Sequence, residues 1–162
     1  MTPPAPAKSP KSHVAAGSRS VRRAAGRDPI LIDTGVLVAM FDRLDAHHEA
    51  AASWMEKCGS ALLTVVPVLT EAAFFLPVRL RLALAGLAAD GTLGLRHPDA
   101  TGYGRIAQLF AKYADRSPDW ADMALVWLAE ASGVVRIATL DVADFSVYRI
   151  HGRKRFELEL LR

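Results

Sequence analysis

Short apolar runs alternate with segments of helical periodicity along most of this chain, and this alternation constrains the fold more than any other feature. The runs cover residues 30–32, 61–64, 93–97 and 134–140, while residues 156–161 alternate apolar and acidic side chains. Apolar residues in the intervening segments recur at helical spacing. Strands that alternate with helices favour a parallel sheet with helices on both faces. We therefore predict an α/β fold with three layers, α/β/α, around a mostly parallel central sheet.

Helix boundaries are marked by proline, glycine and capping residues. We expect helices directly after Asp33-Thr34-Gly35, over 46–57, from Pro67 to Leu76, from Pro77 to about Ala89, over 100–113, and from Ser117-Pro118-Asp119 to Ser132. In the last of these, Ser117 or Asp119 is the expected cap, and Gly133 ends the helix. Residues 141–149 are expected to be irregular or a short helix, and 156–161 an edge strand.

Charge divides the chain into a tail and a domain. Residues 1–28 contain six of the 20 basic residues but only one of the 17 acidic residues, and are rich in proline, alanine and serine. This composition predicts a disordered basic tail at 1–28 and one folded domain at 29–162. The domain then carries a net charge of −2, so the pI of 9.3 is weak support for RNA binding by the domain itself.

Other composition features exclude several classes of protein. Cys58 is the only cysteine, which rules out an internal disulfide and a zinc or redox CxxC motif. The most apolar stretch, residues 80–95, is interrupted by Arg81 and Asp90 and is too polar to span a membrane. The N-terminal segment has no apolar secretory core. We expect a cytoplasmic protein with no membrane association.

Four acidic residues stand apart in apolar sequence. Asp33 and Asp141 each follow a predicted strand, and Asp122 opens an apolar helical segment. Glu71 is the only charged residue between Ser60 and Val78. Burial penalises a carboxylate unless a partner compensates it.

Each acid alone also has an ordinary explanation. Asp122 would complement a helix start, Asp141 would begin a turn, and Glu71 would pair with a core arginine. Their joint pattern is harder to explain in this way, because two follow strands and two lie on helices that would flank the same sheet edge. Clustered carboxylates repel one another, and a divalent cation removes the conflict. All-oxygen ligands favour Mg²⁺ or Mn²⁺ over zinc.

The segments that carry these acids resemble a known family. LIDTGVLVAMFDRLDAHHEAA, TVVPVLTEAAFFL and DWADMALVWLAEASGVVRIATLDVADF are similar to segments of PIN-domain proteins, particularly VapC-type toxins. The resemblance covers nearly everything from Ile30 to Leu160, although the tail at 1–28 departs from the usual pattern. It implies a PIN-like α/β/α domain at 29–162, metal-dependent cleavage of RNA, a homodimer and a cognate antitoxin.

The resemblance also implies a set of site residues. The four family acids fall on Asp33, Glu71, Asp122 and Asp141, and Thr34 and Thr139 occupy positions near the metal. Secondary candidates one helical turn from a matched acid are Asp119 and Asp144. We hypothesise that Asp33 and Asp122 hold the main Mg²⁺ or Mn²⁺ ion, with Asp141 and Glu71 completing or tuning the site.

RNA binding would need cations outside this acidic pocket. The best candidates are Arg149 and the run Arg153, Lys154 and Arg155, although a short charge run is also typical of a solvated turn. The three tryptophans, Trp54, Trp120 and Trp127, are expected to pack in the core rather than to stack on bases.

Two further kinds of protein share part of this pattern. Phosphotransfer enzymes also place an aspartate after the first strand, but dehalogenase-like enzymes need a second aspartate where this chain has Gly35. Receiver domains need an aspartate on the third strand and a late lysine, which the sequence does not offer. The remaining alternative is a catalytically inactive PIN-like module that binds RNA or a protein partner.

Overall fold

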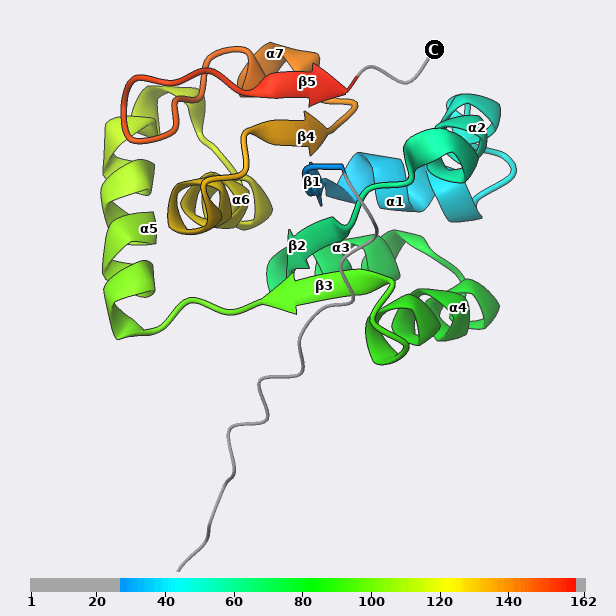
Figure 1. Ribbon diagram of the computed structural model, residues 1–162. Coiled ribbons are helices and arrows are strands. Elements are labelled where there is room, and N and C mark those ends of the chain that lie inside the picture. Colours follow the sequence, from blue (N-terminus) through cyan, green and yellow to red (C-terminus); the bar gives the residue numbers. More distant parts are fainter. Residues whose placement is uncertain (1–26, 160–162) are drawn as a thin grey trace, which may run out of the picture.

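All five strands of the structure run parallel in one sheet, in the order β3-β2-β1-β4-β5 (Figure 1). The computed structural model describes residues 27–159, so nearly all of the predicted tail at 1–28 lies outside the described residues. The two tail residues that are described both contact the domain: Arg27 donates to the carbonyl of Cys58, and Asp28 accepts from Arg136. The strands are β1 (Ile30–Ile32), β2 (Leu62–Val65), β3 (Leu93–Arg96), β4 (Arg136–Ala138) and β5 (Glu157–Glu159).

Helices cover both faces of the sheet, as predicted. In Figure 1, α5 and α6 lie on one side and α1, α2 and α4 on the other. This division follows from right-handed crossovers, because the chain moves from β1 outward to β3 and then returns past β1 to β4. The helices are α1 (Thr34–Phe41), α2 (His48–Cys58), α3 (Val66–Phe75), α4 (Val78–Ala89), α5 (Ala100–Lys112), α6 (Trp120–Ser132) and α7 (Val142–Phe145), with a 3-10 turn at Ala114–Arg116.

The reversal of direction at β1 creates the place where a ligand binds in such sheets. Strand β1 lies between β2 and β4, and the chain leaves its carboxyl end toward β2 and reaches β4 on the other side. In open parallel sheets, the carboxyl ends of the strands at such a reversal, here β1 and β4, are where ligands bind. Asp33 follows β1 directly, and its backbone N–H donates to the carbonyl of Ala138 at 3.1 Å, which joins the two strand ends.

Helix α6 shows how local sequence fixes an element that carries the site. Asp119 caps its N-terminus, as one of the two expected alternatives, and Gly133 ends it with a φ of 74° that favours glycine. Helix α5 packs against it where Gly102 faces Trp127. A Cβ at Gly102 would lie 2.8 Å from the indole nitrogen, so this glycine makes room for the tryptophan.

The strands are confirmed as elements, but their lengths differ from the prediction. The fourth run was expected to form a strand over 134–140, whereas β4 covers only Arg136–Ala138. Thr139 and Leu140 leave the sheet and lead to α7, which starts after its cap Asp141. None of the helices in residues 27–159 has both the length and the apolar character needed to cross a bilayer.

Candidate metal centre

Asp33 forms the buried floor of an acidic cluster at the carboxyl ends of β1 and β4. Its side chain is only 7% exposed. One carboxylate oxygen, Oδ1, accepts the backbone N–H of Thr34 at 2.6 Å, and the other, Oδ2, accepts the hydroxyl of Thr139 at 2.7 Å. Burial raises the pKa of Asp33 to about 6, against the lowering effect of these two hydrogen bonds, and the negative charges of Asp119 and Glu71 raise it further.

Asp122 is the second buried acid of this cluster. It lies in the first turn of α6, is 7% exposed, and its Oδ2 accepts the hydroxyl of Tyr148 at 3.0 Å. Burial and the nearby charges of Asp119, Asp33 and Asp141 together raise its pKa to about 8, although the hydrogen bond from Tyr148 lowers it. Burial is the largest cause of both raised pKa values, and the charges of neighbouring carboxylates add to it, as expected for clustered acids.

Glu71 reaches the cluster from α3 through Thr34. The Glu71 side chain is half-buried, and its Oε2 accepts the Thr34 hydroxyl at 2.8 Å. Thr34 therefore contacts both acids, because its backbone N–H binds Asp33 and its hydroxyl binds Glu71. The structure brings together the first two predicted acids and the first predicted threonine.

Asp119 and Asp141 lie at the exposed rim of the cluster. Asp119 accepts the N–H of Asp122 at 2.7 Å, so its carboxylate caps α6 while its charge acts on both buried acids. Asp141 caps α7 by accepting the N–H of Asp144 at 2.9 Å, and its own N–H donates to the Thr139 hydroxyl at 2.9 Å. Thr139 thus connects the rim to Asp33. Among the four family acids, Asp141 is the most exposed, at the start of α7.

Asp144 is paired with an arginine. One of its oxygens, Oδ1, accepts two hydrogen bonds from the Arg116 guanidinium, at 3.2 Å and 2.8 Å. This ion pair occupies the carboxylate, which makes Asp144 a weaker metal-ligand candidate than Asp119.

The donor set fits a hard divalent cation. The cluster offers carboxylate and hydroxyl oxygens only, and Mg²⁺ is commonly held by one or two carboxylates with water completing its coordination. Within residues 27–159, no three acidic, histidine or cysteine side chains are arranged as a complete ligand set. The best candidates for direct metal ligands are therefore the buried acids Asp33 and Asp122, while the other acids of the cluster would contact the metal through water.

Tyr148 is a site residue that sequence reasoning missed. It is fully buried, and its ring packs edge-on against Tyr113 and Phe145, with ring centroids 5.0 Å and 5.4 Å away. Burial and the neighbouring Asp122 raise the pKa of its hydroxyl, so it stays protonated and donates to that acid. No sequence signal marks it, since Asp122 lies 26 positions away and the segment around Tyr148 has no regular pattern.

The basic side chains predicted to bind RNA differ in whether other groups of the protein already bind them. The Arg149 guanidinium donates to three backbone carbonyls, those of Ser146, Val147 and Tyr148, and so stabilises the turn after α7. Residues 153–155 are all exposed, in a turn where His151 has a positive φ of 48°. Exposure leaves this basic run available to a phosphate backbone, whereas Arg149 already has a structural role.

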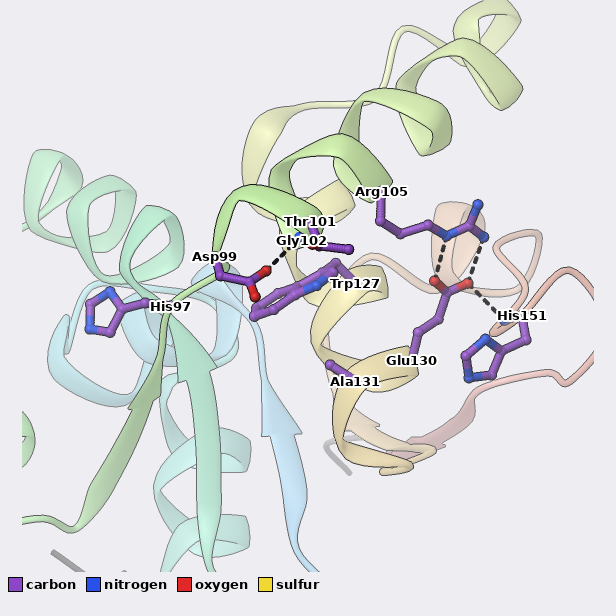
Figure 2. A pocket seen from close by; sticks show the side chains of 9 residues that line it. All are labelled: His97, Asp99, Thr101, Gly102, Arg105, Trp127, Glu130, Ala131 and His151. Carbon is purple, nitrogen blue, oxygen red and sulfur yellow. Dashed lines mark hydrogen bonds and ion pairs between the residues drawn. The ribbon is translucent and has the colours of Figure 1, made fainter. Parts of the chain in front are cut away.

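A separate depression lies between α5, α6 and the turn at His151, and Figure 2 shows its lining. None of the acids of the cluster contributes to it. Its buried carboxylate, Glu130, is bound by Arg105 at 2.7 Å and 2.9 Å and by the His151 N–H at 2.8 Å. Burial opposes ionisation of Glu130, but these contacts hold its pKa below the ordinary value. The ion pair between Arg105 and Glu130 therefore stabilises the fold, and Glu130 is not a candidate reactive group.

The structure is therefore a parallel α/β/α domain with a cluster of carboxylates at the ends of β1 and β4. The comparison with known families agrees: residues 30–149 match the PIN domain, and the chain belongs to that family.

Two relatives from Mycobacterium tuberculosis are similar to this chain. Ribonuclease VapC26 of strain ATCC 25618 / H37Rv is 30% identical over 131 residues, which cover 78% of this chain and 97% of that protein. The crystal structure of VapC20, described as a toxin that cleaves the sarcin–ricin loop, superposes with a TM-score of 0.61. That match has 17% identity and covers 67% of this chain and 86% of the other, so it supports the fold alone.

Proposed function

We propose that this chain is a metal-dependent endoribonuclease, the toxin of a toxin–antitoxin pair, which cleaves RNA phosphodiester bonds at the acidic cluster. The observation that carries the proposal is the geometry of the buried pair Asp33 and Asp122, two carboxylates only 7% exposed, with the charges of Glu71, Asp119 and Asp141 acting on them. Similarity to Ribonuclease VapC26 over nearly its whole length supports the activity.

In this proposal, Asp33 and Asp122 hold the main Mg²⁺ or Mn²⁺ ion, and Glu71 and Asp141 complete or tune the site through water. Such a cation, when bound, lowers the pKa of water and neutralises charge on the phosphoryl group. The chain itself supplies orientation: Thr34 fixes Asp33 and Glu71, Thr139 fixes Asp33, and Tyr148 fixes Asp122. Partners of this kind hold metal ligands in their productive rotamers.

The proposed partners are an RNA substrate, a cognate antitoxin and a second copy of the chain. Exposed apolar side chains on α3 and α4, namely Phe74, Phe75, Val78 and Leu82, support a protein interface there. Residues 153–155 are the proposed contact to phosphates, and we assign the protein to the cytoplasm, where such an RNA substrate would be met.

The test is cleavage of several structured RNAs by the purified full-length chain with Mn²⁺ or Mg²⁺, compared with the same reaction in EDTA. We expect cutting only when metal is present. The alternative, an inactive PIN-like module that binds RNA or a protein partner, would give no cutting under either condition. It would also take up no Mn²⁺ in a titration, since a module that only binds has no use for the cation.

Tyr148 provides a sharper test of the site. In Tyr148→Phe, the loss of one hydroxyl frees the Asp122 carboxylate to rotate and raises its pKa further, so a metal must displace a more tightly held proton. We expect Mn²⁺ affinity to fall about 10-fold, in the range found when partners of metal ligands are removed. Calorimetric titration measures the affinity, and cleavage should recover at saturating Mn²⁺.

The matched control is Tyr113→Phe. The Tyr113 ring packs against Tyr148, but its hydroxyl accepts the backbone N–H of Arg149 and contacts no acid of the cluster. We expect its Mn²⁺ affinity to equal that of the parent protein. Equal affinities in both variants would show that the Tyr148 hydroxyl has no part in positioning Asp122.

A further inference from the structure

Thr64 is a fully buried threonine of β2 that stands opposite the end of β1. Leu63 pairs with Leu31 of β1, so the next residue, Thr64, faces Ile32. The Thr64 hydroxyl donates to the backbone carbonyl of Ile32 at 2.8 Å. Ile32 is the last residue of β1 and directly precedes Asp33. Thr64 therefore binds the peptide group that leads into the acidic cluster.

A hydroxyl at this buried position calls for an explanation. All the other residues of β1 and β2 are aliphatic, and all of them are buried. Valine would fill nearly the same space as threonine and would bury no polar group, whereas burial of a hydroxyl costs free energy unless it is hydrogen-bonded. The bond to Ile32 removes that cost, which alone would make Thr64 an ordinary structural residue. The place of the bond in the sheet gives it a further role.

The bond lies where β1 and β2 leave the sheet. Backbone pairing of these two strands stops at Leu31 and Leu63. At Ile32, one residue further, the Thr64 hydroxyl takes the place of a backbone donor. Strand β2 then ends at Val65, and α3 begins at the next residue. The hydroxyl thus extends the connection between the strands to the point where the site begins.

The peptide group between Ile32 and Asp33 is held at both ends, because β1 lies between β4 and β2 (Figure 1). On the β4 side, the N–H of Asp33 donates to the carbonyl of Ala138 at 3.1 Å. On the β2 side, the carbonyl of Ile32 accepts from Thr64. A peptide group is planar, so fixing its N–H and its C=O sets its orientation. That orientation sets the direction in which the Asp33 side chain leaves the backbone.

We propose that Thr64 is a positioning residue, which fixes the backbone that carries Asp33 and thereby the direction of the Asp33 carboxylate toward a cation. This inference rests on the proposed function and adds β2 to the elements that form the site. Thr34 and Thr139 bind the carboxylate itself, whereas Thr64 acts on the main chain behind it. A functional site needs its groups held to within about 0.5 Å, which a ligand on a loose strand end does not provide.

The experiment compares Thr64→Val with Thr64→Ser in the full chain, and calorimetric titration measures the Mn²⁺ affinity of each. Valine keeps the packing and loses the hydroxyl, while serine keeps the hydroxyl and loses a buried methyl group, which lowers stability. We expect Mn²⁺ affinity to fall about 10-fold in Thr64→Val, at the low end of the range for residues behind metal ligands, because Thr64 acts through the backbone. Thr64→Ser should bind Mn²⁺ like the parent protein although it is less stable.

Hydrogen exchange of the Asp33 amide in the metal-free protein gives a second readout. Loss of the Thr64 hydroxyl frees one end of the peptide group, so the bond from Asp33 to Ala138 should open more often. The Asp33 amide should therefore exchange faster in Thr64→Val than in Thr64→Ser. Exchange at the same rate in both variants would contradict the positioning role.

The matched control is Ser132→Ala. Ser132 also donates its hydroxyl to a backbone carbonyl, that of Leu128 at 2.6 Å, but it lies at the opposite end of α6 from Asp122. Its Mn²⁺ affinity should equal that of the parent. If Thr64→Val binds Mn²⁺ as tightly as the parent, the inference is overturned, even where the variant is less stable. Equal losses of affinity in Thr64→Val and Thr64→Ser also overturn it, and would assign Thr64 to packing alone.

RNA cleavage by the same proteins separates this inference from the proposed function. Metal-dependent cutting by the parent, combined with unchanged Mn²⁺ affinity in Thr64→Val, would sustain the nuclease and reject the positioning role. Mn²⁺ binding that depends on the Thr64 hydroxyl, without cutting by the parent, would reject the nuclease and sustain the positioning role. If the parent protein takes up no Mn²⁺, both are rejected.

Discussion

Asp33→Asn should reduce metal-dependent RNA cleavage by at least about 100-fold, because loss of a direct ligand should cost no less than loss of a partner behind one. The fold should survive. The substitution removes a buried charge, and this gain offsets the loss of one of the two hydrogen bonds that the carboxylate accepts from Thr34 and Thr139. We expect the free energy of unfolding to change by no more than about 2 kcal/mol.

The measurement is a cleavage time course with Mn²⁺ beside a denaturant titration of the same preparation. Asp28→Asn is the control, since Asp28 is an exposed acid just before β1, at the opposite end of the strand from Asp33. It should cleave at the parental rate. A folded Asp33→Asn protein that cuts as fast as the parent would remove Asp33 from the site.

Metal-free protein should lose stability as the pH rises from 5 to 8. The pKa values of Asp33 and Asp122, about 6 and about 8, exceed their ordinary value of 3.8, so the native state holds protons that the unfolded chain has already released. The free energy of unfolding then falls with rising pH until each folded-state pKa is passed. The two groups together should change it by a few kcal/mol, because one pKa unit corresponds to about 1.4 kcal/mol.

Mn²⁺ should reverse this loss at the alkaline end. Metal at about 100 times its dissociation constant stabilises the native state by about 2.7 kcal/mol, and only where the acids are ionised. Denaturant titrations at pH 5 and pH 8, with Mn²⁺ and with EDTA, measure both effects. Asp122→Asn should show a smaller pH dependence and little gain from metal. A metal-free protein that is as stable at pH 8 as at pH 5 would contradict the clustered charge.

The sequence located the buried acids because their physical penalty is visible without a structure. Asp33 and Asp122 are isolated in apolar segments, and a carboxylate there needs a compensating partner. Asp141 ranks above Asp144 in the sequence because it directly follows a predicted strand and matches the family pattern, whereas the burial penalty alone does not rank the two, since both lie near a short helix start. Only the fold brings Arg116 to Asp144, from 28 positions away, and so distinguishes the two.

The tryptophans of α6 show what the sequence pattern could not predict. Trp120 and Trp127 are seven residues apart, about two helical turns, and therefore share a face of α6. The pattern predicts the same environment for both. Coverage by α5 differs along that face: Gly102 lets the helices approach at Trp127, whereas Trp120, beside Phe110, stays 51% exposed and so does not pack in the core as expected. Periodicity assigns a face, but only the packing of the neighbouring helix decides which part of it is covered.

The threonine that joins two strand ends has a consequence for the timing of activity during synthesis. Thr139 bonds Asp33 from 106 positions further along the chain, and it can do so only once β4 has paired with β1 at the register Leu31↔Ile137. A ribosome-bound chain that ends before β4 already contains Asp33, Glu71 and Asp122, yet lacks the strand that completes their surroundings. Under the proposed function, the Thr139 contact that orients Asp33 is therefore missing until the last part of the domain has been synthesised.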